Sequence, residues 1–170
     1  MPRGLPVRSD YLPKELEPGH VIRDADGLPM LRLVDAGDRL AFWLPDVGGS
    51  LVNPKGPGLR ALGLVTTYAR GAAHHASTFR TADLTKGRPV ELRREPDNTH
   101  DRNAVALHAP GSRNRFAFVQ RGKAASLAKR LDAGEALGGV CLRGPGPSRD
   151  DGTAFLVIGS LRDPLALLRD

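Results

Sequence analysis

The sequence has little cysteine, few aromatic residues and no long apolar run. Its single cysteine, Cys141, can build neither a disulfide framework nor a zinc site, so we expect a reducing compartment and a thiol that is simply buried. No window reaches the length of a membrane span, and the first residues lack the apolar core of a secretion signal. These absences predict a cytoplasmic protein without a membrane contact.

Motifs for catalysis are also missing. The glycine runs at 46–58 lack the Lys-Ser/Thr ending of a phosphate-binding loop, and no serine lies in a nucleophile elbow. A metal-dependent nuclease would need a carboxylate cluster, and only Asp97 and Asp101 are close in sequence. The sequence therefore predicts no cofactor and no enzymatic activity, with such a nuclease as the least favoured alternative.

Histidines raise the question of a metal site. Four of them are expected on neighbouring strands: His74, His75, His100 and His108. If His74 and His75 are adjacent on a strand, their side chains point to opposite faces and cannot bind the same ion. We therefore expect no metal site, because spacing alone is weak support for one.

Glycine and proline are plentiful, with 20 and 14 residues, which indicates many turns and a β-rich fold. The net charge of +6 is concentrated: residues 61–144 hold fourteen Lys and Arg against seven Asp and Glu, whereas residues 1–60 hold eight of each. A phosphate-binding surface would have such an excess. A composition with 20 arginines also fits a G+C-rich genome, so charge alone permits a nucleic-acid partner without requiring it.

The first 60 residues are predicted to form an N-terminal arm. Residues 1–28 are interrupted by prolines and should be largely irregular. Met30–Val34 and Arg39–Leu44 are apolar runs joined by a short turn, as in a β-hairpin, and Trp43 should anchor its packing. The glycine-rich stretch Val47–Gly58 is predicted to be a loop or linker.

Residues 61–161 predict a mainly β domain, a small OB-like β-barrel of about six strands with one or two short helices. The expected strands are Leu64–His75, Pro89–Arg94, Asn103–Leu107, Phe116–Val119, Leu137–Leu142 and Thr153–Gly159. Lys123–Ala133 has the apolar periodicity of a helix that ends at Gly134, and a short helix is possible near Ser77–Lys86. Residues 162–170 should be a C-terminal tail.

The segment Arg94–Ala104, which reads REPDNTHDRNA, is a tight connection between two of these strands. Pro96 ends the preceding strand, and Asp or Asn side chains can cap the backbone as Asx turns. Asn98, His100 and Asp101 bring donors, acceptors and a flat ring to one strand end. That combination suits a nucleotide, with stacking on the ring and hydrogen bonds to the sugar or base.

Together with Phe116–Arg121 and the alanine-rich helix, this segment resembles the HIRAN domain family over residues 65–161. The resemblance implies a small OB-like barrel without catalytic residues. Members occur alone in bacteria or fused to DNA translocases that remodel stalled replication forks. The resemblance therefore implies that the partner is single-stranded DNA or a DNA end, captured at its 3′ end. It also implies a role in DNA repair or replication-fork processing, with DNA-processing proteins as further partners.

The resemblance also assigns roles to individual residues. Asn98 would hydrogen-bond the sugar or base, His100 stands where the family has a stacking Tyr, and Asp101 would accept from the terminal 3′-hydroxyl. The aromatic strand position falls on His74, with His75 as the alternative register. Phe118 would face a base, Arg121 would contact phosphate, and Phe155 would stack on the DNA.

Five positions depart from the family pattern. Histidine replaces Tyr at the stacking positions, Thr99 replaces Pro, Ala73 replaces a basic residue and Ala117 replaces Gly. Histidine still stacks, and a protonated ring attracts phosphate. We therefore expect the domain to bind nucleic acid as the family does, whereas its preference for a 3′ end is a hypothesis to test.

A protein-interaction module is the second hypothesis, in which the barrel edge or the Trp43 hairpin binds a protein partner. Such binding should depend weakly on salt. Binding of single strands through several arginines should instead weaken steeply as salt rises. A plot of log binding constant against log salt concentration should have a slope near −0.7 per phosphate contact.

Overall fold

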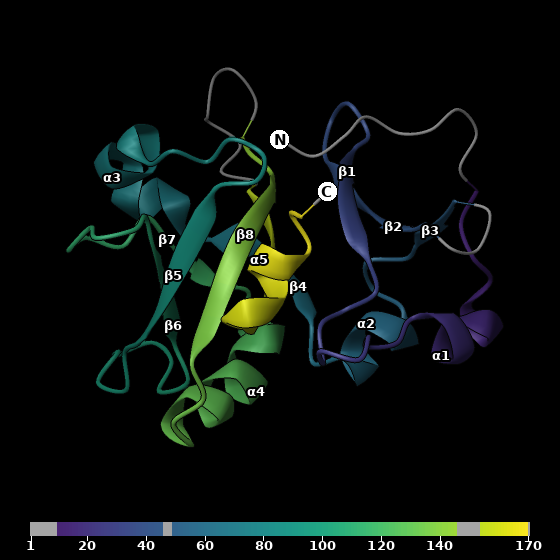
Figure 1. The fold of residues 1–170 in the computed structure, drawn as a ribbon. Coiled ribbons are helices and arrows are strands. Elements are labelled where there is room, and N and C mark those ends of the chain that lie inside the picture. The colour runs from purple at the N-terminus through teal and green to yellow at the C-terminus, as the bar shows by residue number, and fades with distance from the viewer. Residues whose placement is uncertain (1–9, 46–48, 146–153, 170) are drawn as a thin grey trace.

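The computed structural model describes residues 10–45, 49–145 and 154–169. The start of the predicted arm (1–9), the start of the predicted linker (46–48), most of the predicted loop 143–152 and the first residue of the last predicted strand lie outside them. Two β-sheets lie side by side, with helices at their ends and between them (Figure 1). Among the described helices, none has the length and apolar character needed to cross a membrane.

The larger sheet is a closed six-stranded antiparallel barrel in the order β4-β7-β6-β5-β8-β9. Its strands are β4 (Val65–Arg70), β5 (Pro89–Arg94), β6 (Val105–His108), β7 (Ala117–Val119), β8 (Leu137–Arg143) and β9 (Phe155–Ser160). β4 closes the barrel because it pairs with both β7 and β9. The predicted mainly β barrel of about six strands is confirmed.

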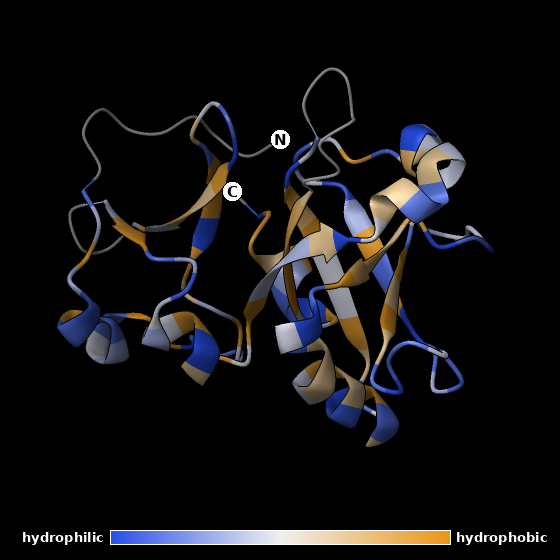
Figure 2. Ribbon diagram, turned by 180° about the vertical axis from the view of Figure 1, so that it is seen from behind, coloured by the Kyte–Doolittle hydropathy of each residue, from blue (hydrophilic) through white to orange (hydrophobic). Residues whose placement is uncertain are grey.

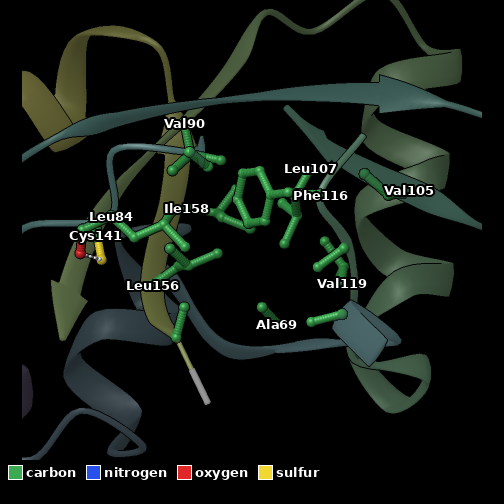
Figure 3. Packing of buried hydrophobic residues seen from close by; sticks show 14 of the residues in the cluster. Ala69, Leu84, Val90, Val105, Leu107, Phe116, Val119, Cys141, Leu156 and Ile158 are labelled. Carbon is green, nitrogen blue, oxygen red and sulfur yellow. Dashed lines mark hydrogen bonds between the residues drawn. The ribbon is translucent and has the colours of Figure 1, made fainter. Parts of the chain in front are cut away.

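The barrel interior is filled by apolar side chains that the period-2 alternation of the strands directs inward. Val90 and Leu92 of β5 point to this side, as predicted, and Leu107, Phe116 and Ile158 meet them in the centre (Figure 3). Burial of one such side chain stabilises the fold by about 1.5–3 kcal/mol. Figure 2 shows the same pattern, with apolar residues concentrated along the strands.

The barrel carries three helical segments at its ends. The 3-10 helix η2 (Ala72–His75) and α3 (Ala76–Thr81) follow β4, and α4 (Arg121–Asp132) follows β7. In α4, Ala124, Leu127 and Ala128 are buried, and Gly134 just beyond it has a φ of 89°. The predicted Lys123–Ala133 helix with its glycine stop is thus confirmed.

The smaller sheet extends the predicted hairpin by one strand. It contains β1 (Arg32–Asp35), β2 (Leu40–Leu44) and β3 (Ser50–Val52), preceded by η1 (Lys14–Leu16) and α1 (Glu17–His20). Trp43 packs against this sheet, as expected. The prediction of a loop over Val47–Gly58 is wrong in its described part, because β3 and the start of α2 (Pro57–Ala61) lie there. Leu51 and Val52 form only a two-residue apolar run, yet both are buried.

The two sheets share a hydrophobic core. Leu33 and Phe42 of the smaller sheet pack in one cluster with Leu142 and Val157 of the barrel. The final helix α5 (Arg162–Ala166) lies between the sheets (Figure 1), and the Leu33 amide donates to the Leu167 carbonyl at 2.7 Å. The prediction of a tail at 162–170 is therefore revised in its described part, because residues 162–169 join the barrel to the N-terminal sheet.

Candidate nucleic-acid interface

A cleft of about 900 Å³ opens at one end of the barrel. The end of β4, η2, the β5–β6 connection, β7 and the start of α4 surround it. Six of the seven residues predicted from the sequence line it: His74, Asn98, His100, Asp101, Phe118 and Arg121. These residues span 48 positions of the chain, so it is the barrel that brings them together.

The β5–β6 connection owes its shape to its own Asx turns. Asn98 Oδ1 accepts from the amides of His100 at 2.9 Å and Asp101 at 3.1 Å, and Asp101 Oδ1 accepts from the Asn103 amide at 2.9 Å. The Asn98 oxygen is thus occupied by the turn. Asp101 Oδ2 accepts from no described residue, which leaves it available to a hydroxyl donor.

The strand that precedes the histidines is shorter than predicted. β4 ends at Arg70 because Gly71 adopts a left-handed φ of 76°, and the chain then turns into η2. The prediction of a strand over Leu64–His75 is wrong beyond Arg70, and so is the argument that placed His74 and His75 on opposite faces of it. His74 is exposed, and both histidines line the cleft. The short helix predicted near Ser77–Lys86 is present as α3.

His75, the alternative register, is the histidine that packs against Phe118. Their ring centroids lie 5.8 Å apart with an interplanar angle of 56°. Burial lowers the pKa of His75, and the nearby positive charge of Arg115 lowers it further. His75 therefore offers the cleft a neutral ring near pH 7.

Arg115 is a cleft residue that the sequence reasoning missed. Its guanidinium lies 5.2 Å from the Phe118 ring centroid, and its Nη1 pairs with Glu95 Oε2 at 3.3 Å. Asn98 Nδ2 contacts the same glutamate at 3.5 Å. Arg113 and Arg115 are two residues apart and directly precede the apolar run that starts at Phe116. This pattern is the sequence signal that could have identified Arg115 as a cleft residue.

Two exposed cations border the cleft, Arg121 at the start of α4 and Arg70 at the end of β4. Within the described residues, neither forms an ion pair with a carboxylate. The first turn of α4 contains no acidic residue, so the positive end of its helix dipole adds to the Arg121 charge. Arg70 was not predicted, because nothing in the sequence marks the last residue of β4 as a cleft residue.

Phe155 does not reach the cleft. It is 5% exposed, and its ring centroid lies 4.8 Å from that of Tyr68, in the core that joins the barrel to the N-terminal sheet. The expectation that Phe155 stacks on DNA is therefore corrected. The expectation came from the family resemblance, which does not include the N-terminal sheet that covers this side of the barrel.

The remaining histidine and cysteine candidates do not form a metal site with any described residue. Across the described part of the chain, no three His, Cys, Asp or Glu residues lie close enough together to hold a metal ion. His108 is buried, which lowers its pKa, and its Nδ1 contacts the Ser112 carbonyl. Burial raises the pKa of the Cys141 thiol to about 12, and the thiol donates to the Leu84 carbonyl.

Comparison with solved structures finds matches at low sequence identity. A Lactobacillus plantarum protein is 21% identical, with 55% of this chain and 87% of that chain covered and a TM-score of 0.47. The crystal structure of the HIRAN domain of human HLTF is also 21% identical, with 62% and 83% covered and a TM-score of 0.45. An NMR structure of the same human domain is 19% identical, with 62% and 82% covered and a TM-score of 0.43.

The family comparison is more decisive. No curated protein matches the sequence, but residues 62–161 match the HIRAN domain. The matched stretch covers more than half of the chain and includes every residue that lines the cleft. HIRAN domains are DNA-binding modules and are not generally catalytic. The chain therefore belongs to the HIRAN domain family.

Proposed function

We propose that the protein is a non-catalytic module that binds single-stranded DNA and holds the 3′ end of the strand in the cleft. The observation that carries this proposal is the meeting of aromatic rings, an available carboxylate oxygen and two unpaired arginines in one open cleft. These are the three kinds of group that a strand end requires, because it presents a base, a hydroxyl and phosphates.

In this proposal Asp101 Oδ2 accepts a hydrogen bond from the terminal 3′-hydroxyl. The oxygen is well placed because Asp101 Oδ1 is fixed by the Asn103 amide. A hydrogen bond to a charged group contributes about 1.5–3 kcal/mol. Asn98 shapes the loop through the His100 and Asp101 amides, and its Nδ2, which donates one hydrogen to Glu95, has a second hydrogen for the sugar or base.

The terminal base stacks on the ring surface formed by Phe118 and the histidines. Phe118 is partly exposed, and His75 and Arg115 flank it. Stacking of one base on an aromatic side chain contributes about 1–3 kcal/mol and tolerates any base. His74 and His100, both exposed at the cleft, complete the surface.

Arg121 and Arg70 bind the phosphates that follow the terminal nucleotide. Both guanidinium groups are exposed. Arginine suits this task because its planar donors match the geometry of phosphate oxygens. A module with these properties would serve DNA repair or replication-fork processing, where strand ends are exposed.

Fluorescence anisotropy tests the proposal with 5′-labelled single strands that end in a 3′-hydroxyl or a 3′-phosphate. We expect tighter binding of the 3′-hydroxyl strand, since a phosphate would face the Asp101 carboxylate. We also expect log Kd to change with log salt by about 0.7 per phosphate contact. Absence of binding would contradict the whole proposal, and equal binding of both strands would contradict the capture of the end.

A further inference from the structure

Two cations, one of them the cleft residue Arg70, lie close to the ring of Tyr68. Arg70 Cζ lies 5.4 Å from the centroid of the Tyr68 ring, and Lys55 Nζ lies 5.8 Å from the same point. Arg70 belongs to β4 of the barrel, whereas Lys55 belongs to the turn between β3 and α2. Lys55 thus comes from outside the HIRAN match at 62–161.

The turn that carries Lys55 is held in place by three hydrogen bonds. The Lys55 amide donates to Asn53 Oδ1 at 2.9 Å, and the Gly56 amide donates to the Asn53 carbonyl at 3.0 Å. Thr66 Oγ1 of β4 donates to the Pro54 carbonyl at 2.8 Å, which ties the turn to the barrel. The Lys55 backbone therefore has a fixed position relative to the cleft strand.

The buried carboxylate of Glu17 packs against this turn. Glu17 is fully buried, and its Oε2 accepts from the Gly58 amide at 3.1 Å. A Cβ added at Gly56 would lie 2.5 Å from Glu17 Oε2, so any side chain at Gly56 would displace the turn or the glutamate. The N-terminal region thus uses a buried acid and a glycine to hold one exposed lysine beside β4.

Lys55 has no competing carboxylate partner among the residues that the structure describes. Its side chain is exposed. Tyr68 connects Lys55 to the cleft: its ring also lies beside Arg70, which lines the cleft, and its amide donates to Oε1 of Gln120, another cleft residue, at 3.5 Å. Exposed cations beside an aromatic ring are typical of a surface that binds a single strand.

We propose that Lys55 binds a backbone phosphate of the DNA strand beyond the cleft, so that the N-terminal sheet lengthens the binding site of the HIRAN domain. This inference rests on the proposed function of the cleft. Single-strand sites on OB-type barrels span roughly 4–16 nucleotides, which is more than one terminal nucleotide. In this arrangement Arg70 binds a phosphate near the cleft and Lys55 binds one farther along the strand.

The test compares the full-length protein with Lys55→Gln on 5′-labelled strands of 4 and 12 nucleotides, both with a free 3′-hydroxyl. We expect Lys55→Gln to bind the 12-nucleotide strand roughly 3–10-fold more weakly at low salt and to reduce its salt slope by about 0.7. Affinity for the 4-nucleotide strand should not change. Lys55→Arg should keep the wild-type slope, because it keeps the charge.

Lys14→Gln is the matched control, since Lys14 is an exposed lysine of the same N-terminal region that lines no part of the cleft. If wild type binds both strands and Lys55→Gln equals Lys14→Gln on both, the lysine is only a structural neighbour of Tyr68 and the inference is wrong. Equal weakening on both strands would also overturn it, because Lys55 would then act on the cleft. If wild type binds neither strand, the proposed function itself fails.

Discussion

Two aromatic pairs on the same barrel have opposite surroundings. Phe118 and His75 face the open cleft beside Arg115, whereas Tyr68 and Phe155 lie toward the N-terminal sheet, which leaves Phe155 only 5% exposed. Each pair includes a strand residue of the barrel, Phe118 of β7 in one and Tyr68 of β4 with Phe155 of β9 in the other. The element packed against the barrel therefore determines whether a ring such as Phe118 stays open to a ligand or a ring such as Phe155 is buried, and the residue type does not.

The largest effect should follow from Phe155→Ala. Removal of a buried phenyl ring leaves a cavity in the core shared by the two sheets, and we expect the free energy of unfolding to fall by about 3–5 kcal/mol. Urea unfolding measures this change. Affinity of the folded protein for a 4-nucleotide strand should stay at the wild-type value, and a strong loss of that affinity would place Phe155 in the binding site after all.

Phe118→Ala should give the opposite result. The ring is partly exposed, so its loss should change unfolding far less than Phe155→Ala. We expect DNA affinity to fall by about 1–3 kcal/mol, which anisotropy measures, because a base loses its stacking surface. Phe118→Leu keeps apolar packing without the aromatic ring and should lose nearly as much affinity. Wild-type affinity in both variants would contradict the stacking role.

Arg121→Gln should have a smaller and uniform effect on binding. We expect all single strands to weaken by a similar factor, with the salt slope reduced by about 0.7, because one phosphate contact is lost. Arg162→Gln provides the matched control, since Arg162 is exposed on α5 and lines no part of the cleft. If the two variants behave alike, Arg121 is not a phosphate ligand.

The smallest effect concerns pH and His75. Because burial lowers the pKa of His75 in the folded state, the unfolded chain binds the proton more readily. The free energy of unfolding should therefore fall as the pH drops below about 6.5, the ordinary histidine value. Urea midpoints between pH 7.5 and pH 5 should fall less in His75→Gln than in wild type, with His108 responsible for a remaining decrease in the same direction. Superimposable profiles would show that His75 is not buried enough to matter.

The sequence predicts best where a single element determines its own structure. β5 has the predicted bounds Pro89–Arg94 because strict alternation is read locally, and the Arg94–Ala104 segment carries its own Asx turns. Prediction fails where a distant element decides. Phe155 was expected at the DNA from the family resemblance, and nothing local in the sequence indicates that the N-terminal sheet covers it.

The same reason explains the other misses. β3 is too short to stand out from the glycines around it, and its strand character comes from pairing with β2. Arg70 and Arg115 become cleft residues only when β4 and β7 pair within the closed barrel. His74 lies outside β4, contrary to the prediction, because Gly71 adopts a left-handed conformation that ends the strand. A glycine permits this conformation but does not require it, so the sequence alone does not predict it.

The most direct test of the central claim is a double-mutant cycle between Asp101 and the terminal hydroxyl of the strand. Asp101→Asn keeps an oxygen for the Asn103 amide and replaces the available carboxylate oxygen with a donor. Wild type and variant are measured against strands that end in a 3′-hydroxyl or a 3′-hydrogen. We predict a coupling energy of about 1–3 kcal/mol that favours the wild-type protein with the hydroxyl. A coupling of zero, with wild type binding both strands equally, would contradict end capture by this cleft.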